Sequence, residues 1–309
     1  MGGRKIRGQK LKVMPEVAKG GVELSVVIPT AGRAAKLAST LQALGEMAEG
    51  TPPFEVVVVL DGEDPATREA LKRPWPFPLV VVAQPRRGAA AARNLGCRVA
   101  HAPTVLFVND DTRPHPACLR AHWEAHVKFG PAGALGFTVW DPEAPVTPYM
   151  RWLAPAGHQF NFSRLKPYEV IPWDACWTTN LSVPRSWVLD EPLDEGFPGA
   201  AAEDSEWGYR LWRRGWKILY LPDAVCFHDH PYTGPKDFRS RARMAGAGAR
   251  LVVRRHPELV WIFMVKPLLA CAARALTLLL PAKSYRQKLW DFDFRWNYLV
   301  GVVRGRKAA

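Results

Sequence analysis

Two adjacent carboxylates follow an apolar run in the first half of the chain. Asn109, Asp110 and Asp111 come directly after residues 104–108, whose sequence is TVLFV. Carboxylate oxygens are preferred ligands of hard divalent cations such as Mg²⁺ and Mn²⁺, and a cation held there would bind and neutralise a diphosphate. The alternative is a turn in which Asp111 or Thr112 caps the next helix. The pair alone leaves both interpretations open.

Two further features could bind parts of a nucleotide. Asp61 follows the apolar residues 56–60, and a carboxylate at a strand end can accept a hydrogen bond from a base N–H; an Asp-Gly turn is the structural alternative. Residues 86–94 open a helix with small side chains, so a phosphate could approach its N-terminus and pair with Arg87 or Arg93. A close-packed alanine helix without a bound phosphate would show the same sequence pattern. The chain has no GxxxxGK[ST] motif, which argues against a P-loop nucleotidase.

The second half of the chain carries two more chemical candidates. Glu203 and Asp204 begin a predicted helix at 205–214, where the helix dipole keeps a carboxylate ionised, as a general base must be. The same dipole favours acidic residues there without any catalytic role. His228 follows a predicted strand at 217–221 and could bind a metal or a phosphate. A lone histidine is more often structural.

Alternating strands and helices would bring these residues together. The apolar and amphipathic patterns predict strands at 24–29, 56–60, 79–83 and 104–108 and helices at 33–47, 65–72, 88–100 and 115–129. Such alternation is typical of a parallel sheet covered on both faces, and ligands bind beyond the carboxyl ends of its strands. The sequence therefore predicts an α/β fold with a polar edge formed by Thr30, Asp61, Gln84 and residues 109–111.

The charge distribution indicates which class of partner the protein binds. The 309 residues carry a net charge of +13, and the basic residues gather in the first twenty positions, at 239–255 and at 283–307. Acidic residues gather instead at 55–70 and 190–206. This separation favours surface binding by the basic ends over a nucleic-acid groove in the middle. Five cysteines without a CxxC pair and the absence of an apolar signal-peptide core indicate a cytoplasmic protein.

The C-terminal part differs from the rest. Residues 1–22 are expected to form a flexible basic leader, 23–245 the catalytic domain and 246–309 a helical appendage. Within the appendage, residues 259–280 are apolar but interrupted by Lys266, Pro267 and Arg274. We expect one or two helices that lie at a membrane interface. The alternatives are a helical hairpin buried against protein, as in a homodimer, and a bilayer-spanning helix.

The order of the motifs resembles that of glycosyltransferase family 2, a large GT-A-type family, over about residues 23–230. The motifs in chain order are IPT at 28–30, Asp61, RGAAAARNLG at 87–96, NDD at 109–111, TTNLSVPRSW at 178–187, LDEGF at 193–197 and EDSEWGYRLWRRGWKI at 203–218. The resemblance implies a Rossmann-like, mostly parallel central sheet with helices on both faces. It also implies roles for individual residues.

The residue patterns above and the resemblance together predict four groups of site residues. The nucleotide sugar would be bound by Pro29, Thr30, Arg33, Asp61, Arg87, Arg93, Asn109 and Asp110; a divalent metal, Mn²⁺ or Mg²⁺, by Asp111 and His228; Asp204 would be the catalytic base; and Trp177, Asn180 and Glu203 would face the acceptor. The chain departs from the family at Asn109 and Leu60, where an aspartate is common. Because of Asn109, Asp111 is the main expected metal ligand and the identity of the metal stays open. Because of Leu60, the expected contact with the base rests on Asp61 alone.

The implied function is metal-dependent transfer of a sugar from a nucleotide-diphosphate sugar, with UDP-sugars favoured, to a hydroxyl of a saccharide or lipid-linked acceptor. We expect the transfer to invert the anomeric carbon and to serve cell-envelope glycan or glycolipid synthesis. We also expect the protein to lie peripherally on the inner face of the cell membrane. A retaining enzyme of mannosylglycerate-synthase type is the nearest alternative. A sugar nucleotidyltransferase should carry a Gly-rich loop after the first strand, but residues 29–33 contain one glycine. The acidic cluster at the sheet edge argues against a non-enzymatic basic protein.

Overall fold

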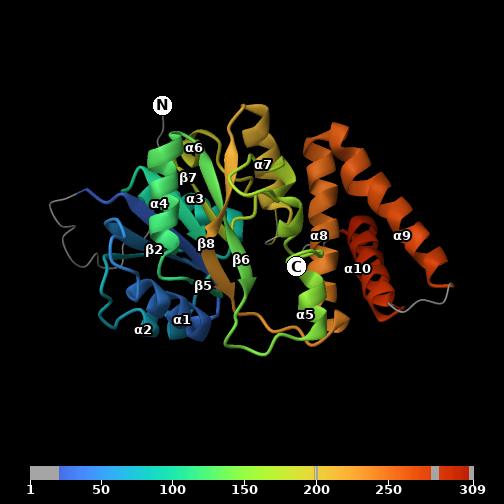
Figure 1. Cartoon of the computed structure of the whole chain (residues 1–309), viewed down its shortest axis with the longest axis horizontal. Coiled ribbons are helices and arrows are strands. Elements are labelled where there is room, and N and C mark those ends of the chain that lie inside the picture. The colour runs from blue at the N-terminus through green and yellow to red at the C-terminus, as the bar shows by residue number, and fades with distance from the viewer. Residues whose placement is uncertain (1–20, 198, 200, 280–284, 306–309) are drawn as a thin grey trace.

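The first half of the chain forms the predicted alternation of strands and helices (Figure 1). The computed structural model describes residues 21–197, 199, 201–279 and 285–305, so nearly all of the expected basic leader lies outside the described residues. The elements are β1 (Leu24–Thr30), α1 (Ala34–Gly45), β2 (Phe54–Asp61), α2 (Pro65–Ala70), β3 (Leu79–Gln84), α3 (Ala89–Val99) and β4 (Thr104–Val108). Strand β1 pairs in parallel with both β2 and β4, and β2 pairs in parallel with β3. The predicted parallel sheet is confirmed in this half.

The second half extends the same sheet with strands of both directions. The elements are β5 (Thr112–Pro114), α4 (Cys118–Phe129), β6 (Gly133–Trp140), α5 (Pro148–Leu153), η1 (Phe162–Arg164), η2 (Trp173–Ala175), β7 (Asn180–Pro184), α6 (Arg185–Asp190), α7 (Glu203–Arg213) and β8 (Ile218–His228). The strand order is β3-β2-β1-β4-β7-β6-β8-β5. Strand β7 runs antiparallel to β4 and β6, and β5 runs antiparallel to β8. The complete sheet is therefore mixed.

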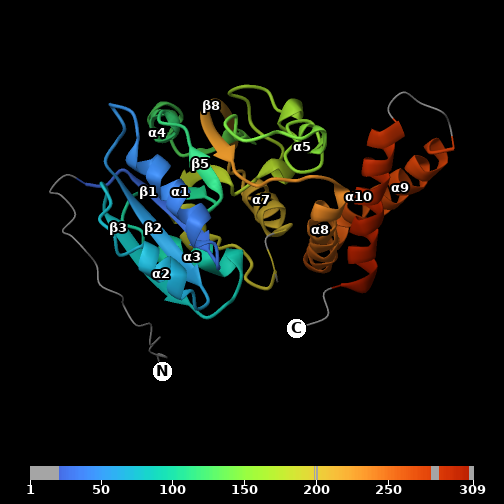
Figure 2. The ribbon, with the colours of Figure 1, turned by 90° about the horizontal axis from the view of Figure 1, so that it is seen from below.

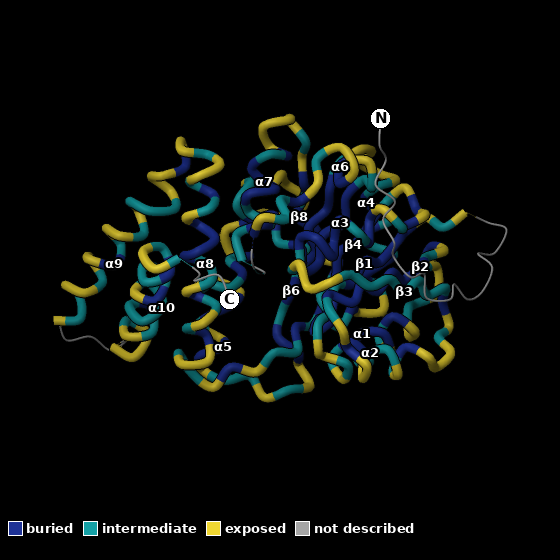
Figure 3. Tube along the Cα trace, turned by 180° about the vertical axis from the view of Figure 1, so that it is seen from behind, coloured by how far each residue is buried: buried dark blue, intermediate teal, exposed yellow. Residues whose placement is uncertain are grey.

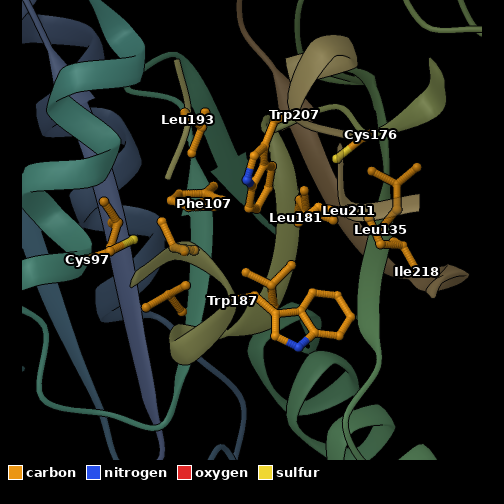
Figure 4. Close-up of a cluster of buried hydrophobic side chains, with 14 of the residues drawn as sticks. Cys97, Phe107, Leu135, Cys176, Leu181, Trp187, Leu193, Trp207, Leu211 and Ile218 are labelled. Atoms are coloured by element: carbon orange, nitrogen blue, oxygen red, sulfur yellow. The ribbon is translucent and has the colours of Figure 1, made fainter. Parts of the chain in front are cut away.

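Two apolar layers cover the faces of the sheet, because successive side chains of a strand point to opposite faces. Val27 and Phe107 pack on one face with Trp207 of α7, whereas Val26 and Leu106 pack on the other. Figure 4 shows the first layer, in which the Phe107 and Trp207 rings meet edge to face with centroids 6.1 Å apart. The continuous burial of the central strands explains why their sequences are apolar throughout.

Glycine allows α3 to lie close to the sheet. A Cβ atom at Gly96 would stand 2.4 Å from Cγ1 of Val27, which is far inside van der Waals contact. A larger residue would push α3 outward together with Arg87 and Gly88, which precede its first turn. Close packing at Gly96 thus fixes where the polar start of α3 lies.

The C-terminal helices stand beside the sheet domain (Figures 1 and 2). They are α8 (Pro235–Arg255), η3 (Pro257–Leu259), the π-helical turn η4 (Trp261–Val265), α9 (Lys266–Thr277) and α10 (Tyr285–Arg304). Helices α8 and α10 pack closely, since a Cβ at Gly246 would lie 1.9 Å from the Tyr298 carbonyl oxygen and one at Gly301 would lie 2.0 Å from that of Arg243. The expected boundary at residue 245 falls inside α8.

The apolar run of the appendage forms one helical segment with little cover. Within the described residues, Pro257–Thr277 is long and apolar enough by length and composition to cross a membrane, with a mean hydropathy of 1.8. Only 11% of its most apolar window is buried, and Figure 3 shows α9 mostly in the colours of exposed and partly exposed residues. In this single chain, the segment is therefore not packed as a buried hairpin.

Candidate active site

A cavity of about 1230 Å³ opens at the carboxyl ends of β1, β2 and β4. The far side of the cavity is formed by α8 and by the end of α10. Nine residues predicted from the sequence line it: Pro29, Thr30, Arg33, Asp61, Arg87, Arg93, Asn109, Asp111 and His228. The remaining predicted residues, Asp110, Trp177, Asn180, Glu203 and Asp204, do not line it. The sheet edge thus gathers the donor-side predictions in one place.

The carboxylate pair after β4 is held by two side chains from β1 and the turn after it. Thr30 Oγ1 donates to Asp110 Oδ2 at 2.7 Å, and Arg33 donates from Nε to the same oxygen at 3.0 Å. Arg33 also donates from Nη1 to Asp111 Oδ2 at 2.7 Å. Burial raises the pKa of Asp110 to about 6, with the Arg33 charge opposing the shift. Asp110 lies fully buried behind the cavity, so Asp111 is the carboxylate that a ligand can reach.

Two histidines flank Asp111 at the end of β8. His228 Nε2 lies 3.7 Å from Asp111 Oδ1, and His230 Nδ1 lies 3.5 Å from Asp111 Oδ2. Burial lowers the pKa of His228 to about 4, so this ring is neutral at pH 7. Burial of Asp111 opposes its ionisation, but the hydrogen bond with His230 and the Arg33 charge hold the pKa of Asp111 well below its ordinary value. Asp111 is therefore an ionised carboxylate beside a neutral imidazole.

His230 was not among the predicted site residues, although the sequence contained a signal for it. His228 and His230 are two positions apart, and such residues point to the same side of an extended chain. Their rings stack with centroids 5.8 Å apart, and both line the cavity. The sequence prediction assigned a role to His228 alone.

The residues around Asp111 fit a cation that also binds phosphate. Asp111 Oδ1 is buried and has no hydrogen-bond partner among the described residues. Among the described residues, no group of three or more His, Cys, Asp or Glu side chains forms a complete metal site. Magnesium-type sites use one or two carboxylates and complete their coordination with substrate phosphates and water, so an Asp111-based site with His228 beside it meets that pattern.

Asp61 orders the turn that leads into α3. Its Oδ1 accepts hydrogen bonds from the Arg87 backbone N–H at 2.7 Å and from Gln84 Nε2 at 2.9 Å, and its Oδ2 accepts one from the Gly88 N–H at 2.9 Å. Gly88 adopts a φ of 94°, which favours glycine. A carboxylate offers about four acceptor positions, so Asp61 can support this turn and still accept a hydrogen bond from a ligand.

Arg93 connects the sheet edge to the start of α7. This buried side chain donates to Asn109 Oδ1 at 3.0 Å and pairs with Glu203 Oε1 at 3.2 Å. Burial and the neighbouring Asp204 charge raise the pKa of Glu203 to about 7, against the opposing charge of Arg93. Burial also raises the pKa of Asp204. Asp204 is partly exposed, and its Oδ1 accepts a hydrogen bond from the Ser205 N–H at 2.8 Å.

The loop before α7 connects the cavity lining to this acidic pair. Gly196 and Gly199 line the cavity, whereas Glu203 and Asp204 do not. Ala202, which directly precedes the pair, has a φ of 71°, a conformation that is uncommon for a residue with a Cβ. The acidic pair therefore lies just beyond the cavity wall.

Trp177 and Asn180 do not line the cavity. Trp177 is partly exposed and packs against Phe162 and Phe160, with ring centroids 4.9 and 5.7 Å apart, and Phe160 is the one of the three that lines the cavity. Asn180 is fully buried in β7, where its Nδ2 donates to the Ala224 carbonyl at 2.7 Å and its Oδ1 lies 2.9 Å from His122 Nε2. The predicted contact of these two residues with an acceptor stays a prediction.

The helical wall of the cavity was not anticipated from the sequence. Its charged residues are Arg241, Arg250 and Arg254 of α8 and Arg304 of α10. The basic cluster at 239–255 was interpreted as part of a surface-binding end. Long-range packing of α8 in two apolar clusters, which no local pattern reports, instead places several of these arginines opposite the sheet edge.

Comparison with known proteins gives the same picture of the fold. The family model for glycosyl transferase family 2 matches residues 25–187. A validoxylamine A glucosyltransferase from Streptomyces hygroscopicus subsp. jinggangensis is 30% identical over 271 residues, which are 77% of this chain and 62% of that relative. The chain therefore spans less than two thirds of that relative's length.

Two solved structures resemble the whole described fold. A mannosyltransferase from Pyrobaculum calidifontis, in complex with GDP-Man and Mn²⁺, aligns with a TM-score of 0.66 and 17% identity over 94% of this chain and 89% of its own. The TarS fragment of S. aureus in complex with UDP-GlcNAc aligns with a TM-score of 0.53 and 17% identity, over 91% and 82% of the two chains. Since the family model covers more than half of the sequence, this chain belongs to glycosyltransferase family 2.

Proposed function

We propose that the protein transfers a sugar from a nucleoside-diphosphate sugar to an acceptor hydroxyl, with a divalent cation at Asp111. The observation that carries this proposal is the convergence of Asp61, Asp111 and the start of α3 on one cavity at the sheet edge. Membership in the family supports it, as do the nucleotide-sugar complexes of the two structural neighbours. A UDP-sugar remains the favoured donor.

The donor would be held by groups that are already in place. Asp61 would accept a hydrogen bond from the base, while the N-terminus of α3 and Arg87 would face the phosphates. Asp111 and His228, with His230 beside them, would hold Mn²⁺ or Mg²⁺. When bound, the cation neutralises the charge that develops on the departing diphosphate. Arg33 would keep Asp110 and Asp111 ionised and close together.

The acceptor would react in a single displacement. Asp204 would take the proton from the acceptor hydroxyl, the hydroxyl oxygen would bond to the anomeric carbon, and the bond from that carbon to the diphosphate oxygen would break. The electron pair of that bond leaves with the nucleoside diphosphate. Attack opposite to the leaving group inverts the anomeric configuration. Glu203, bound to Arg93, would position Asp204 and set its ionisation.

The experiment is a transfer assay with UDP-, GDP-, dTDP- and ADP-sugars, each with Mn²⁺, Mg²⁺ or EDTA, and with saccharide acceptors. We expect one donor class to be used, with activity lost in EDTA and restored by one of the metals. The anomeric configuration of the product is read by NMR. A product that retains the donor configuration would contradict the inverting mechanism, and activity unaffected by EDTA would contradict the cation.

We also propose that the exposed face of the Pro257–Thr277 segment binds an anionic membrane surface from the cytoplasmic side. Trp261, Leu268, Leu269 and Leu276 are between 55% and 68% exposed, with Arg274 on the same helix as the leucines. Apolar side chains flanked by basic ones are typical of helices that lie at the membrane interface. This position would suit a lipid-linked or envelope acceptor.

Cosedimentation with vesicles tests the membrane proposal. The wild type should bind vesicles that contain phosphatidylglycerol and release from them at high salt, and Leu276→Glu should weaken binding. Leu189→Glu, which changes an exposed leucine on α6, is the matched control. If Leu276→Glu leaves vesicle binding intact but splits a dimer in solution, the face is an interface between two copies of the chain.

A further inference from the structure

Helix α8 lies across the cavity from the sheet edge and is anchored near both ends. Near its start, Phe238 packs against Tyr232, with ring centroids 5.2 Å apart, and joins the cluster around Trp140. Near its end, Val252 packs with Phe197 in a second cluster. The residues of α8 that line the cavity are Arg241, Ala247, Arg250, Leu251 and Arg254, and the end of α10 adds Arg304 and Gly305. The anchors therefore fix this stretch of the helix over the cavity.

The cavity lining is strongly basic. Among the described residues, eight arginines and two aspartates line it. On the sheet side, three of the four arginines are matched with acids: Arg33 pairs with Asp111, Arg87 with Glu195, and Arg93 with Glu203. Arg86 is exposed and forms no ion pair with a described residue. The charge on this side of the cavity is thus largely compensated within the protein.

The arginines on the helical side are not matched in this way. Arg241, Arg250, Arg254 and Arg304 form no ion pair with any residue that the structure describes, and Arg250 makes a single hydrogen bond of 3.2 Å to the neutral Val303 carbonyl. Arg241 is half-buried. A guanidinium group that is partly withdrawn from water without a counter-ion, as Arg241 is, is costly. The other three arginines are exposed. Four positive charges that line one cavity without an acidic partner among the described residues attract an anionic ligand.

Arg241 lines the same cavity as His228, the proposed cation ligand, and as Arg93, which pairs with Glu203 beside the proposed base. An acceptor would have to bring its hydroxyl into this cavity.

We propose that the acceptor carries a phosphate group and that Arg241, Arg250 and Arg254 bind it. The planar guanidinium fork matches the oxygens of a phosphate, and the donor diphosphate would be bound on the opposite side by the start of α3 and by a cation held at Asp111. This inference rests on the proposed function, because it assigns the acceptor side of the same cavity. The phosphate can belong to a soluble phosphorylated saccharide or to a lipid phosphate.

The experiment measures ligand binding by calorimetry on the full chain, preloaded with UDP and Mn²⁺. The probes are methyl phosphate, farnesyl phosphate and farnesol, with methyl glucuronide as a carboxylate. We expect both phosphates to bind and farnesol to bind at least ~10-fold more weakly than farnesyl phosphate. Much tighter binding of farnesyl phosphate than of methyl phosphate would identify the lipid source, and similar affinities would identify a soluble one. Preference for methyl glucuronide, or equal binding of farnesol and farnesyl phosphate, would overturn the proposal.

The variants separate the two sides of the cavity. Arg241→Gln and the exposed pair Arg250→Gln with Arg254→Gln should each weaken phosphate binding by ~10-fold and change UDP affinity by less than ~2-fold. Lys236→Gln removes an exposed charge from α8 outside the cavity and should behave as the wild type. An equal loss of UDP affinity would show that the arginines serve the donor instead. If no nucleoside diphosphate binds the wild type, the proposed function and this inference fall together.

Discussion

The two sides of the cavity differ in how far their charged groups are paired within the protein. On the sheet side, most charged groups have a partner: Asp61 accepts three hydrogen bonds, and Arg33 is bound to the Asp110 and Asp111 carboxylates. On the helical side, the three arginines of α8 that line the cavity form no ion pair with a described residue. A site that is compensated in advance holds its geometry for one ligand, whereas an uncompensated wall requires the ligand to bring the charge.

The acidic pair at the start of α7 lies just beyond the cavity wall. Loss of its proposed base should have the largest effect on sugar transfer. Replacing Asp204 with Asn removes the proposed base but keeps the shape of the side chain. We expect kcat for sugar transfer to fall by ~10²–10⁴-fold while the affinity for the nucleotide sugar changes by less than ~2-fold. Initial rates and donor titrations give the two values. Asp190→Asn, an exposed change on α6, is the control, and full activity of Asp204→Asn would disprove the assignment of the base.

Two glycine variants disturb one side of the cavity at a time. An alanine at Gly96 would force α3 away from Val27, and an alanine at Gly246 would force α8 away from α10. Each should lower the free energy of unfolding by about 1–3 kcal/mol, as measured by denaturant unfolding. At temperatures where both fold, Gly96→Ala should weaken nucleotide binding and Gly246→Ala should mainly reduce turnover with the acceptor. Equal losses of nucleotide affinity would mean that the two sides are not independent.

The pH dependence of transfer sharpens the role of Glu203 and is the smallest expected effect. Burial and the Asp204 charge raise the pKa of Glu203 to about 7, so the acidic pair takes up a proton as the pH falls through that range. Because a base has to be ionised, kcat/KM should decline below about pH 7. Glu203→Gln removes one negative charge beside Asp204, so the acidic limb should move to lower pH. A limb that stays in place would exclude coupling between the two carboxyls.

The sheet side could be predicted from the sequence because its signals are local. The apolar run TVLFV forms β4 with the predicted bounds, and Asp61 and Asp111 follow strands whose burial is visible in their composition. Parallel pairing then brings those strand ends together at one edge.

The position of His228 at the cavity depends on a feature of its strand that the local pattern does not contain. The strand was expected to end at residue 221, but β8 continues to His228 through Pro222 and Asp223. The register between β6 and β8 shifts at Gly136 and Phe137, where the partner residue moves from Leu221 to Val225. A bulge of this kind accommodates a proline that cannot donate a ladder hydrogen bond. The sequence singles out this histidine by its position after the expected strand, and the family resemblance implies its place near the metal.

The helical side depends on contacts between residues far apart in the chain. Three arginines of α8 line the cavity, and the helix is held there by Phe238, which packs on Tyr232, and by Val252, which lies in one apolar cluster with Phe197. Periodicity identifies an apolar stripe but not the surface that it covers. The full burial of Asn180 has the same origin, since burial in β7 is a property of the assembled sheet.

The most direct test of the central claim is Mn²⁺-dependent binding of nucleoside diphosphates to the wild type and to Asp111→Asn. UDP, GDP, dTDP and ADP are each titrated by calorimetry with Mn²⁺ and with EDTA. The account predicts that one of them binds the wild type in the presence of Mn²⁺, and that Asp111→Asn weakens this binding by ~10–100-fold and removes its metal dependence. Binding to Asp111→Asn that is as tight and as metal-dependent as in the wild type would contradict the account.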